Sequence, residues 1–522
     1  MILEGIRMED NKVQVSLEEL LYYILFAVIL FTKGVGLDEG SLLFRGCLML
    51  GVLLLACKFL VGQYSMAEII IAGVLGIWGA FTFKVTGSLG MFIYVVLAIG
   101  MKNVSVKRIF VVGTTVWSIC MFYSVTAAVF WGRTGVRRVD EKFGMGPVLR
   151  ESLGYTHPNV LHITYVLLMV FALYLCINHK KKIFYTVCLL LLGNLYVFMY
   201  SFSSTGVLTS AVLFILFFYF YKRRKFSLWE TGIIQGLPIV CVIISIVFPM
   251  ALGNGILFEI VNKIFNSRLW AIKVFFALYD ISLFGGGNEG IDFSLDNSYV
   301  YAINEYGVIP FIMLTAAYVL LLRYCIKKNL RMELAVICTF LFAGISEPFL
   351  FNASIKNITF IFLGEFLYRV IENEKCVFKL LSRYNKCFLF SCDFGIKLKK
   401  RLSSTRWKMV AGVALTAGIL SFLLLFPKDV IGINQVYVDE KLCDAARDTV
   451  RLTEFPAVDG TMYIENASKD INYYYFTHEN SQLIELMDLR FKISLSVYIA
   501  VAVGILYMCG RKTFNQKFRT EK

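Results

Sequence analysis

The residues best suited to chemistry lie in one polar stretch, residues 262–310, which interrupts an otherwise apolar sequence. It contains Arg268 on a segment whose apolar residues recur at helical spacing, a glycine cluster at 285–287, and then Asp296. A guanidinium can hold a diphosphate with two hydrogen bonds, and a carboxylate can take the proton of a hydroxyl group. The same Arg can instead reach toward lipid phosphate, and an Asp before a helix can simply cap it.

A second polar group runs from Arg150 to Asn159 and precedes an apolar run. Pro158 suits the first turn of a helix, with Thr156 or His157 as its cap. The free N–H groups of such a helix end attract anions. His157 is therefore either a cap or a candidate proton acceptor.

Two further sets of polar residues stand at the ends of apolar runs. Ser203, Ser204 and Thr205 form a short hydroxyl-rich turn, where they can cap a helix or hold phosphate oxygens. Glu347 lies near the end of another apolar run and is followed by Pro348. A carboxylate inside an apolar span is costly, so Glu347 is either functional or the partner of an Arg.

The composition determines the environment in which these residues act. The chain has 522 residues, of which 58% are hydrophobic and 17% charged, with a mean hydropathy of +0.69. A soluble protein cannot bury that much apolar surface, so most of the chain must face lipid. The net charge of +15 then fits basic loops on the inner leaflet rather than nucleic-acid binding. The 13 Cys show no metal-ligand spacing, and we expect neither a metal nor another cofactor.

Apolar runs of about 15–23 residues predict an all-α polytopic membrane protein with about 14 transmembrane helices. The expected spans are 18–32, 42–57, 65–82, 89–100, 108–131, 159–177, 183–200, 206–221, 232–252, 307–322, 334–352, 358–371, 409–426 and 491–509.

Basic loops set the predicted orientation. Lys and Arg collect at 179–182, 221–225, 323–331 and 372–408, all on one side if the spans alternate, and that side is predicted to be cytoplasmic. Both termini then lie inside, whereas the segment 427–490, with 12 acidic and 6 basic residues, lies outside.

This topology divides the chain into four parts. They are N-terminal transmembrane helices (1–131), a transmembrane core (132–371) with outer loops 132–158 and 253–306, a basic cytoplasmic loop (372–408), and a C-terminal helix pair (409–522) that encloses the exterior segment 427–490.

The order of the short motifs resembles a known family. The motifs are Gly154-Tyr155-Thr156-His157-Pro158-Asn159, Ser203-Ser204-Thr205-Gly206, Ser267-Arg268-Leu269-Trp270, Leu283-Phe284-Gly285-Gly286-Gly287, Asp296-Asn297-Ser298-Tyr299 and Glu305-Tyr306-Gly307. In this order and on the predicted outer side, they resemble the bacterial O-antigen ligase and polysaccharide polymerase superfamily, which includes the Wzy-type polymerases.

The resemblance implies a fold related to the lipid-dependent (GT-C-like) glycosyltransferases in the bacterial cytoplasmic membrane. It implies joining of undecaprenyl-diphosphate-linked oligosaccharide units for capsule, exopolysaccharide or O-antigen at the outer face, without a metal ion. Flippase and chain-length regulator proteins would be partners. The base would be Asp296, His157 or Glu347; substrate contacts would be Arg268, Arg150, Asn159, Ser203, Ser204, Thr205, Asn297 and Tyr299.

Three functions remain open from the sequence. Ligases of this family commonly have a His-Asn pair where this chain has Asp296-Asn297, so the resemblance favours a polymerase over a ligase. A flippase or transporter of lipid-linked oligosaccharide would be expected to show internal repeats and charged or broken helices at the bilayer midplane. The polar residues here are predicted at outer helix ends, which favours an enzyme.

Overall fold

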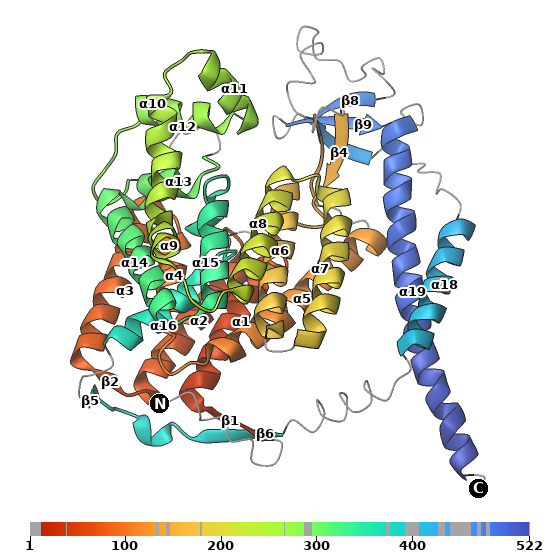
Figure 1. Cartoon of the computed structure of the whole chain (residues 1–522), viewed down its shortest axis with the longest axis horizontal. Helices are drawn as coiled ribbons and strands as arrows, with labels where there is room; N and C mark the ends of the chain where they lie inside the picture. Colours follow the sequence, from red (N-terminus) through yellow and green to blue (C-terminus); the bar gives the residue numbers. More distant parts are fainter. Residues whose placement is uncertain are drawn as a thin grey trace.

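The computed structural model describes most of the chain as a bundle of helices (Figure 1). The described residues are 12–37, 39–131, 135–141, 147–177, 180–265, 267–286, 295–371, 376–391, 407–425, 434–438, 461–466, 471–476 and 481–520.

Long helices that alternate in direction make up the bundle. They are α1 (Leu17–Gly34), α2 (Leu42–Val61), α3 (Met66–Thr86), α4 (Gly90–Ile99), α5 (Val106–Trp131), α6 (Pro158–Cys176), α7 (Lys180–Ser201), α8 (Ser204–Lys222), α9 (Leu228–Val242) with its continuations η1 (Ile243–Val247) and α10 (Phe248–Ala251), α14 (Val308–Lys327), α15 (Arg331–Ala343) and α16 (Thr359–Val370).

Nine helices within the described ranges are long and apolar enough to cross a membrane. They fall on nine of the fourteen predicted spans, and two shorter apolar helices, Gly90–Ile99 and Met409–Leu424, fall on two more. The protein is therefore a multi-pass helical membrane protein, as predicted. The full number of fourteen spans stays a prediction.

The prediction was wrong about where the span 334–352 ends. Helix α15 stops at Ala343, and residues 344–358 form a loop that contains only a short 3-10 turn, η2 (Pro348–Leu350). Pro348 lacks a backbone N–H and disfavours helical backbone at the residue before it. Glu347 thus lies in this loop and not inside a helix.

Short helices cover one end of the bundle. They are α11 (Ile256–Ile264), α12 (Arg268–Leu278) and α13 (Ser298–Tyr306). Figure 1 shows α11 and α12 above the bundle, with α13 directly beneath them.

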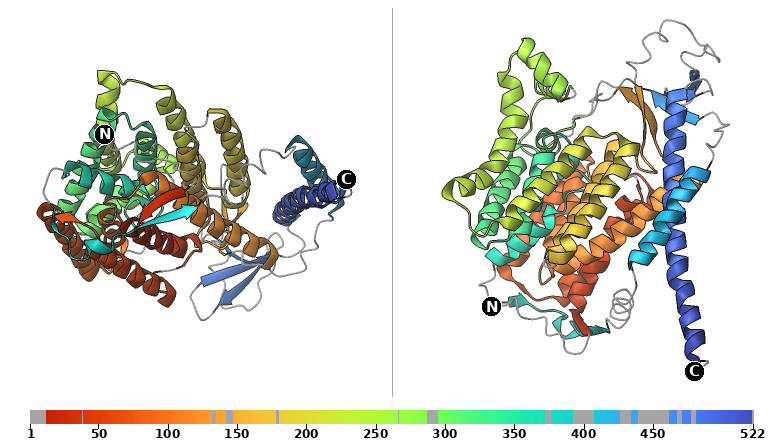
Figure 2. Two further views of the ribbon diagram at one scale, coloured as in Figure 1. Left: turned by 90° about the horizontal axis from the view of Figure 1, so that it is seen from below. Right: turned by 45° about the vertical axis from the view of Figure 1, so that its right-hand side comes forward.

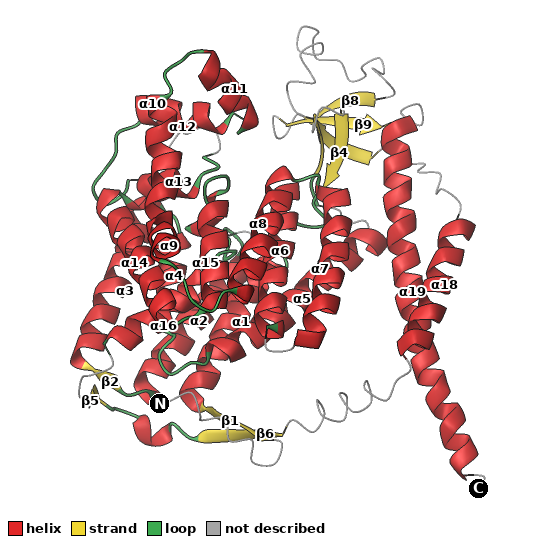
Figure 3. Cartoon of the chain, in the orientation of Figure 1, coloured by secondary structure: helices red, strands yellow, loops and turns green. Residues whose placement is uncertain are grey.

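The protein is mostly helical, and small sheets lie at both ends of the bundle (Figure 3). At one end, β1 (Lys12–Ser16) pairs with β6 (Cys387–Ser391), and β2 (Tyr64–Ser65) pairs with β5 (Cys376–Phe378), near the 3-10 turn η3 (Ser382–Tyr384). At the other end, five strands form a sheet in the order β4-β3-β7-β9-β8. These strands are β3 (Arg137–Glu141), β4 (Pro147–Glu151), β7 (Asn434–Val438), β8 (Thr461–Asn466) and β9 (Ile471–Phe476).

The five-stranded sheet joins two parts that the sequence division kept separate. Strand β3, from the predicted outer loop 132–158, pairs in parallel with β7 from the C-terminal segment. Beside the bundle stand α18 (Trp407–Leu424) and the long α19 (Ser481–Thr520), which pack on each other (Figure 2). Arg490 on α19 donates from Nη2 to the carbonyl oxygen of Leu149 at 2.6 Å, and its own carbonyl accepts from the Tyr200 hydroxyl at 3.1 Å.

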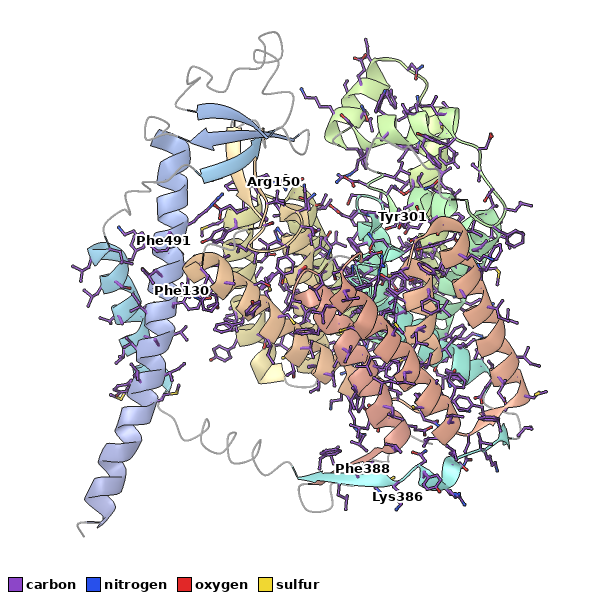
Figure 4. All side chains as sticks on the ribbon, turned by 180° about the vertical axis from the view of Figure 1, so that it is seen from behind. Phe130, Arg150, Tyr301, Lys386, Phe388 and Phe491 are labelled. Carbon is purple, nitrogen blue, oxygen red and sulfur yellow. The ribbon has the colours of Figure 1, made fainter. Side chains whose placement is uncertain are left out.

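The two ends of the bundle carry different parts of the chain. Figure 4 shows Arg150 and Tyr301 toward one end and Lys386 and Phe388 at the other. Strand β1 and the last turns of α19 lie at the Lys386 end. Which end faces the cytoplasm stays a prediction. The Arg150 end, which carries the five-stranded sheet, is called the sheet end below.

Charged side chains tie the helices together at the Lys386 end. The Lys58 ammonium is fully buried and donates to the carbonyl oxygens of Glu18 (3.2 Å) and Lys102 (2.8 Å). Arg108 pairs with Glu19 at 2.7 Å. These contacts join α1, α2 and the α4–α5 connection, so this charge cluster stabilises the scaffold rather than forming a pocket.

Candidate functional site

Several predicted site residues converge on the buried carboxylate of Glu347. Its Oε1 accepts from the Thr205 hydroxyl at 2.7 Å and from the Asn159 Nδ2 at 3.3 Å. The Arg268 Nη2 lies 3.7 Å from the same oxygen. Residues from the starts of α6, α8 and α12 thus converge on one atom of the 344–358 loop.

Arg268 links Glu347 to the second carboxylate, Asp296. Its Nη2 lies 3.5 Å from the Asp296 Oδ2, and its side chain is 12% exposed, whereas that of Asp296 is 36% exposed. Arg268 is the first residue of α12 and follows Ser267, whose φ of +63° makes a tight left-handed turn. A cation at the positive end of a helix is unfavourable, and the two carboxylates offset it. The Arg268 Nε has no hydrogen-bond partner within the described residues.

The second predicted cation, Arg150, is linked to Glu347 through Asn159. Arg150 is buried on β4 and donates from Nη2 to the Asn159 Oδ1 at 2.6 Å and from Nε to the Ser201 carbonyl at 2.7 Å. The Asn159 amide therefore bridges a guanidinium and a carboxylate. Arg150 orients this bridge. Its link to Glu347 runs through the Asn159 amide, whereas the Arg268 Nη2 lies 3.7 Å from the Glu347 carboxylate.

Three helix caps fix the starts of α6, α8 and α13. His157 caps α6, because its Nδ1 accepts from the Asn159 N–H at 3.1 Å, and Pro158 follows in the first turn. Ser203 caps α8 by accepting from the Gly206 N–H at 3.1 Å. Both caps confirm the structural alternative that the sequence left open. Ser204 is the first residue of α8 and is half-buried.

The cap of α13 is Asn297 and not Asp296. The Asn297 Oδ1 accepts from the Tyr299 and Val300 N–H groups, while its Nδ2 donates to the Ser245 hydroxyl (2.9 Å) and the Ile345 carbonyl (2.8 Å). The Tyr299 hydroxyl is buried and donates to the Leu341 carbonyl at 2.7 Å. Asn297 and Tyr299 thus hold α13 against the 344–358 loop, and the polar groups of both are used within the protein.

The glycine motif anchors the chain that leads to Asp296. Gly285 has a φ of +83°, and a Cβ there would lie 2.3 Å from the Glu305 carbonyl oxygen. The Val308 N–H also donates to the Ser282 carbonyl at 3.1 Å. The glycine is needed because two backbones touch here. Gly287, the last of the cluster, lies outside the described residues.

Sequence reasoning missed two residues near this site. Lys356 lies in the same loop as Glu347 and is 8% exposed. Burial lowers the pKa of Lys356 to about 8, although the nearby Glu347 opposes this shift; Lys33 adds to it. A lone Lys between two apolar runs on the predicted outer side was the available signal. His162, one turn into α6, bonds through Nδ1 to the Ser201 hydroxyl (3.0 Å) and through Nε2 to the Asn194 amide (2.9 Å).

The protonation of Glu347 depends on its surroundings. Burial raises the pKa of Glu347 above its ordinary value; Arg268 opposes this shift, and Asp296 adds to it. The cluster can therefore bind a proton more readily than an exposed carboxylate does.

The arrangement offers a guanidinium for anions and an accessible carboxylate for a proton. No group of three or more His, Cys, Asp or Glu in the described part of the chain is placed to hold a metal ion. Neither a family model, nor a curated protein, nor a solved structure matches this chain. Its function must therefore be argued from the residues themselves.

Replacing Gly206 tests whether the close contact between the starts of α6 and α8 is needed for stability. A Cβ at Gly206 would lie 2.2 Å from the His162 Cγ, which is buried and bonded on both ring nitrogens. We expect Gly206→Ala to lower the stability by about 1–3 kcal/mol, since the ring has to move. Thermal unfolding in detergent measures this. Gly232→Ala on α9 is the control, because none of the described atoms lies within 4 Å of its Cβ position. Equal midpoints for Gly206→Ala and the native protein would contradict the expectation.

Proposed function

We propose that this protein is a polysaccharide polymerase, a membrane glycosyltransferase that joins undecaprenyl-diphosphate-linked oligosaccharide repeat units at the outer face of the bacterial cytoplasmic membrane. The observation that carries the proposal is the convergence of Arg268, Asp296, Asn159 and Thr205 around Glu347 at one end of a membrane-spanning bundle. The order of motifs, which resembles the polymerase and ligase superfamily, supports it independently.

Arg268 has the chemistry required for the leaving group. In the reaction, the bond between the anomeric carbon of the donor sugar and the diphosphate oxygen breaks, and the acceptor hydroxyl oxygen bonds to that carbon. Negative charge grows on the departing diphosphate. The guanidinium of Arg268 lies in a largely buried position, where it can stabilise that charge more strongly than in water.

The two carboxylates have different roles in this proposal. Asp296 is the more exposed of the two, so it is the group that takes the proton of the acceptor hydroxyl. Glu347 is buried and bonded to Thr205 and Asn159, so it positions Arg268 rather than touching substrate. His157 is a less suitable base, since its Nδ1 already caps α6.

The proposal is tested with purified protein in detergent and synthetic lipid-linked repeat units. A polymerase lengthens the glycan on the carrier without a second leaflet, and the chain-length distribution is read on a gel. A flippase leaves single units unchanged under these conditions. A ligase transfers glycan to a different acceptor without extending it. Either of the last two results would overturn the proposal.

The fall in activity at low pH is expected to depend on the protonation of Glu347. Above its raised pKa, Glu347 is ionised and attracts Arg268; as the pH falls through that value, Glu347 gains a proton and the attraction is lost. We expect kcat to fall on the acid side at a pH above the ordinary value of 4.5 for Glu. In Glu347→Gln, kcat should be lower throughout and should lack that limb. An unchanged acid limb in the variant would exclude Glu347 as its origin.

A further inference from the structure

A large apolar groove opens on the side of the bundle between α2 and α3, with α4 behind them. Its volume is about 990 Å³, at the upper end of the usual range for small-molecule sites, roughly 300–1,000 Å³. The α2 wall includes Leu48, Val52 and Ala56, and the α3 wall includes Ala80 and Phe83. Helices α2 and α3 are both membrane-spanning candidates, so the groove faces the lipid tails.

Among the described residues that line the groove, the charged ones stand at the sheet end. Arg45, in the first turns of α2, and Glu39, in the loop before α2, both line it. Glu39 pairs with Lys33 at 3.4 Å, whereas Arg45 is exposed. The groove therefore suits a ligand with a long apolar tail and an anionic group at the membrane surface.

This end of the groove adjoins the elements that carry the candidate site. Gly87 and Leu89 line the groove, and the Ser88 hydroxyl between them lies 3.5 Å from the Tyr301 hydroxyl of α13. At Gly90, the first residue of α4, a Cβ would lie 2.7 Å from the Phe351 carbonyl oxygen. The groove wall thus packs directly on α13 and on the 344–358 loop.

Two lysines, Lys33 at the groove mouth and Lys356 near Glu347, interact electrostatically. Lys33 pairs with Glu39 at the mouth and lies close enough to Lys356 to lower the pKa of that buried group. Lys356 in turn acts electrostatically on Glu347, which contacts Arg268. Lys356 is more than nine-tenths buried. An anionic group at the groove mouth therefore meets Arg45 and Lys33, with Glu39 beside them.

We infer that the groove between α2 and α3 binds the hydrocarbon tail of a phosphate-bearing polyisoprenoid lipid, with the phosphate held at the Arg45 and Lys33 end. This inference rests on the proposed function, because the polyisoprenoid is the carrier of the proposed substrate. An ordinary two-tailed phospholipid is the competing occupant. The contacts of the groove wall with α13 and with the 344–358 loop favour the carrier, because these elements hold the candidate site, which a bulk phospholipid does not need to reach.

The test measures binding of undecaprenyl phosphate to the whole protein in detergent by native mass spectrometry, against phosphatidylglycerol as competitor. Ala80→Trp fills the groove from α3, and Val52→Trp fills it from α2. We expect each to weaken carrier binding at least tenfold, and Arg45→Ala to weaken it several-fold. Ile77→Trp is the matched control, because Ile77 is a 74% exposed residue of α3 that does not line the groove.

Two results would overturn the inference: carrier binding that Ala80→Trp and Val52→Trp leave unchanged, or equal binding of phosphatidylglycerol and the carrier by the native protein. Failure of the proposed function would look different. The native protein would then bind undecaprenyl phosphate in the groove but would not extend lipid-linked repeat units.

Discussion

Replacing Arg268 with Ala is expected to lower kcat/KM for chain extension by about 10²–10³-fold, the usual effect of removing one donor that stabilises transition-state charge. Arg268 alone links Asp296 to Glu347 among the described contacts, and its position near the sheet end makes it the candidate diphosphate contact. The measurement is the rate of polymer formation from lipid-linked repeat units by purified protein. Arg268→Lys is expected to recover little activity, because an ammonium cannot hold a diphosphate with a planar pair of N–H groups.

Lys273→Ala provides the control on the same helix. Lys273 belongs to α12, but its ammonium contacts the Gly253 and Asn254 segment and not the carboxylates. We expect this variant to polymerise at the native rate. Long polymer made by Arg268→Ala at the native rate, with the protein still folded in detergent, would remove Arg268 from the mechanism.

Local sequence patterns predicted the helices and two of the caps. Apolar runs such as 42–57 and 206–221 correspond to α2 and α8, because a helix that faces lipid needs only length and apolar side chains. The caps at His157 and Ser203 were also predictable, since each bonds to a backbone N–H two or three residues away. Interactions of such short range depend on residues that are neighbours in the sequence, so they can be predicted from it.

The contacts that make the site are of the opposite kind. Glu347 bonds to Thr205 and to Asn159, which lie 142 and 188 positions away in the chain. The sequence identified these residues one by one, as polar groups at helix ends, but nothing in their spacing shows that they meet. The meeting depends on how α6, α8 and α15 pack, which is a property of the whole bundle.

One sequence expectation failed for an identifiable reason. Hydropathy extended the span 334–352 past Ala343, because residues 349–351 are apolar and a hydropathy window does not register that Pro348 breaks the helix. No sequence pattern indicated that the predicted outer loop 132–158 contacts the C-terminal segment. Their strands β3 and β7 pair in parallel across almost 300 positions, as Arg138 with Tyr437 and Val139 with Val438 show. Such strands are short and carry little signal of their own partner.

The second large effect is expected at Asp296. Replacement by Asn keeps the shape of the side chain but removes its capacity to accept a proton, so kcat should fall by about 10²–10⁴-fold, the usual contribution of a general base. KM should change little, because Arg268 still has Glu347 as its partner. The measurement is the steady-state rate of chain extension as a function of acceptor concentration. Asp296→Glu, with the carboxylate displaced by one methylene group, should recover part of the loss.

Asp280→Asn is the matched control for the loss of one carboxylate charge. Asp280 lies between α12 and α13, as Asp296 does, but it is more exposed and has no ion pair with Arg268. If both Asn variants slow the reaction equally, the effect comes from the charge of the loop and not from proton transfer. If Asp296→Asn is fully active while Glu347→Gln is not, the roles of the two carboxylates are reversed: the buried group would be the base, and Asp296 would only hold Arg268 in place.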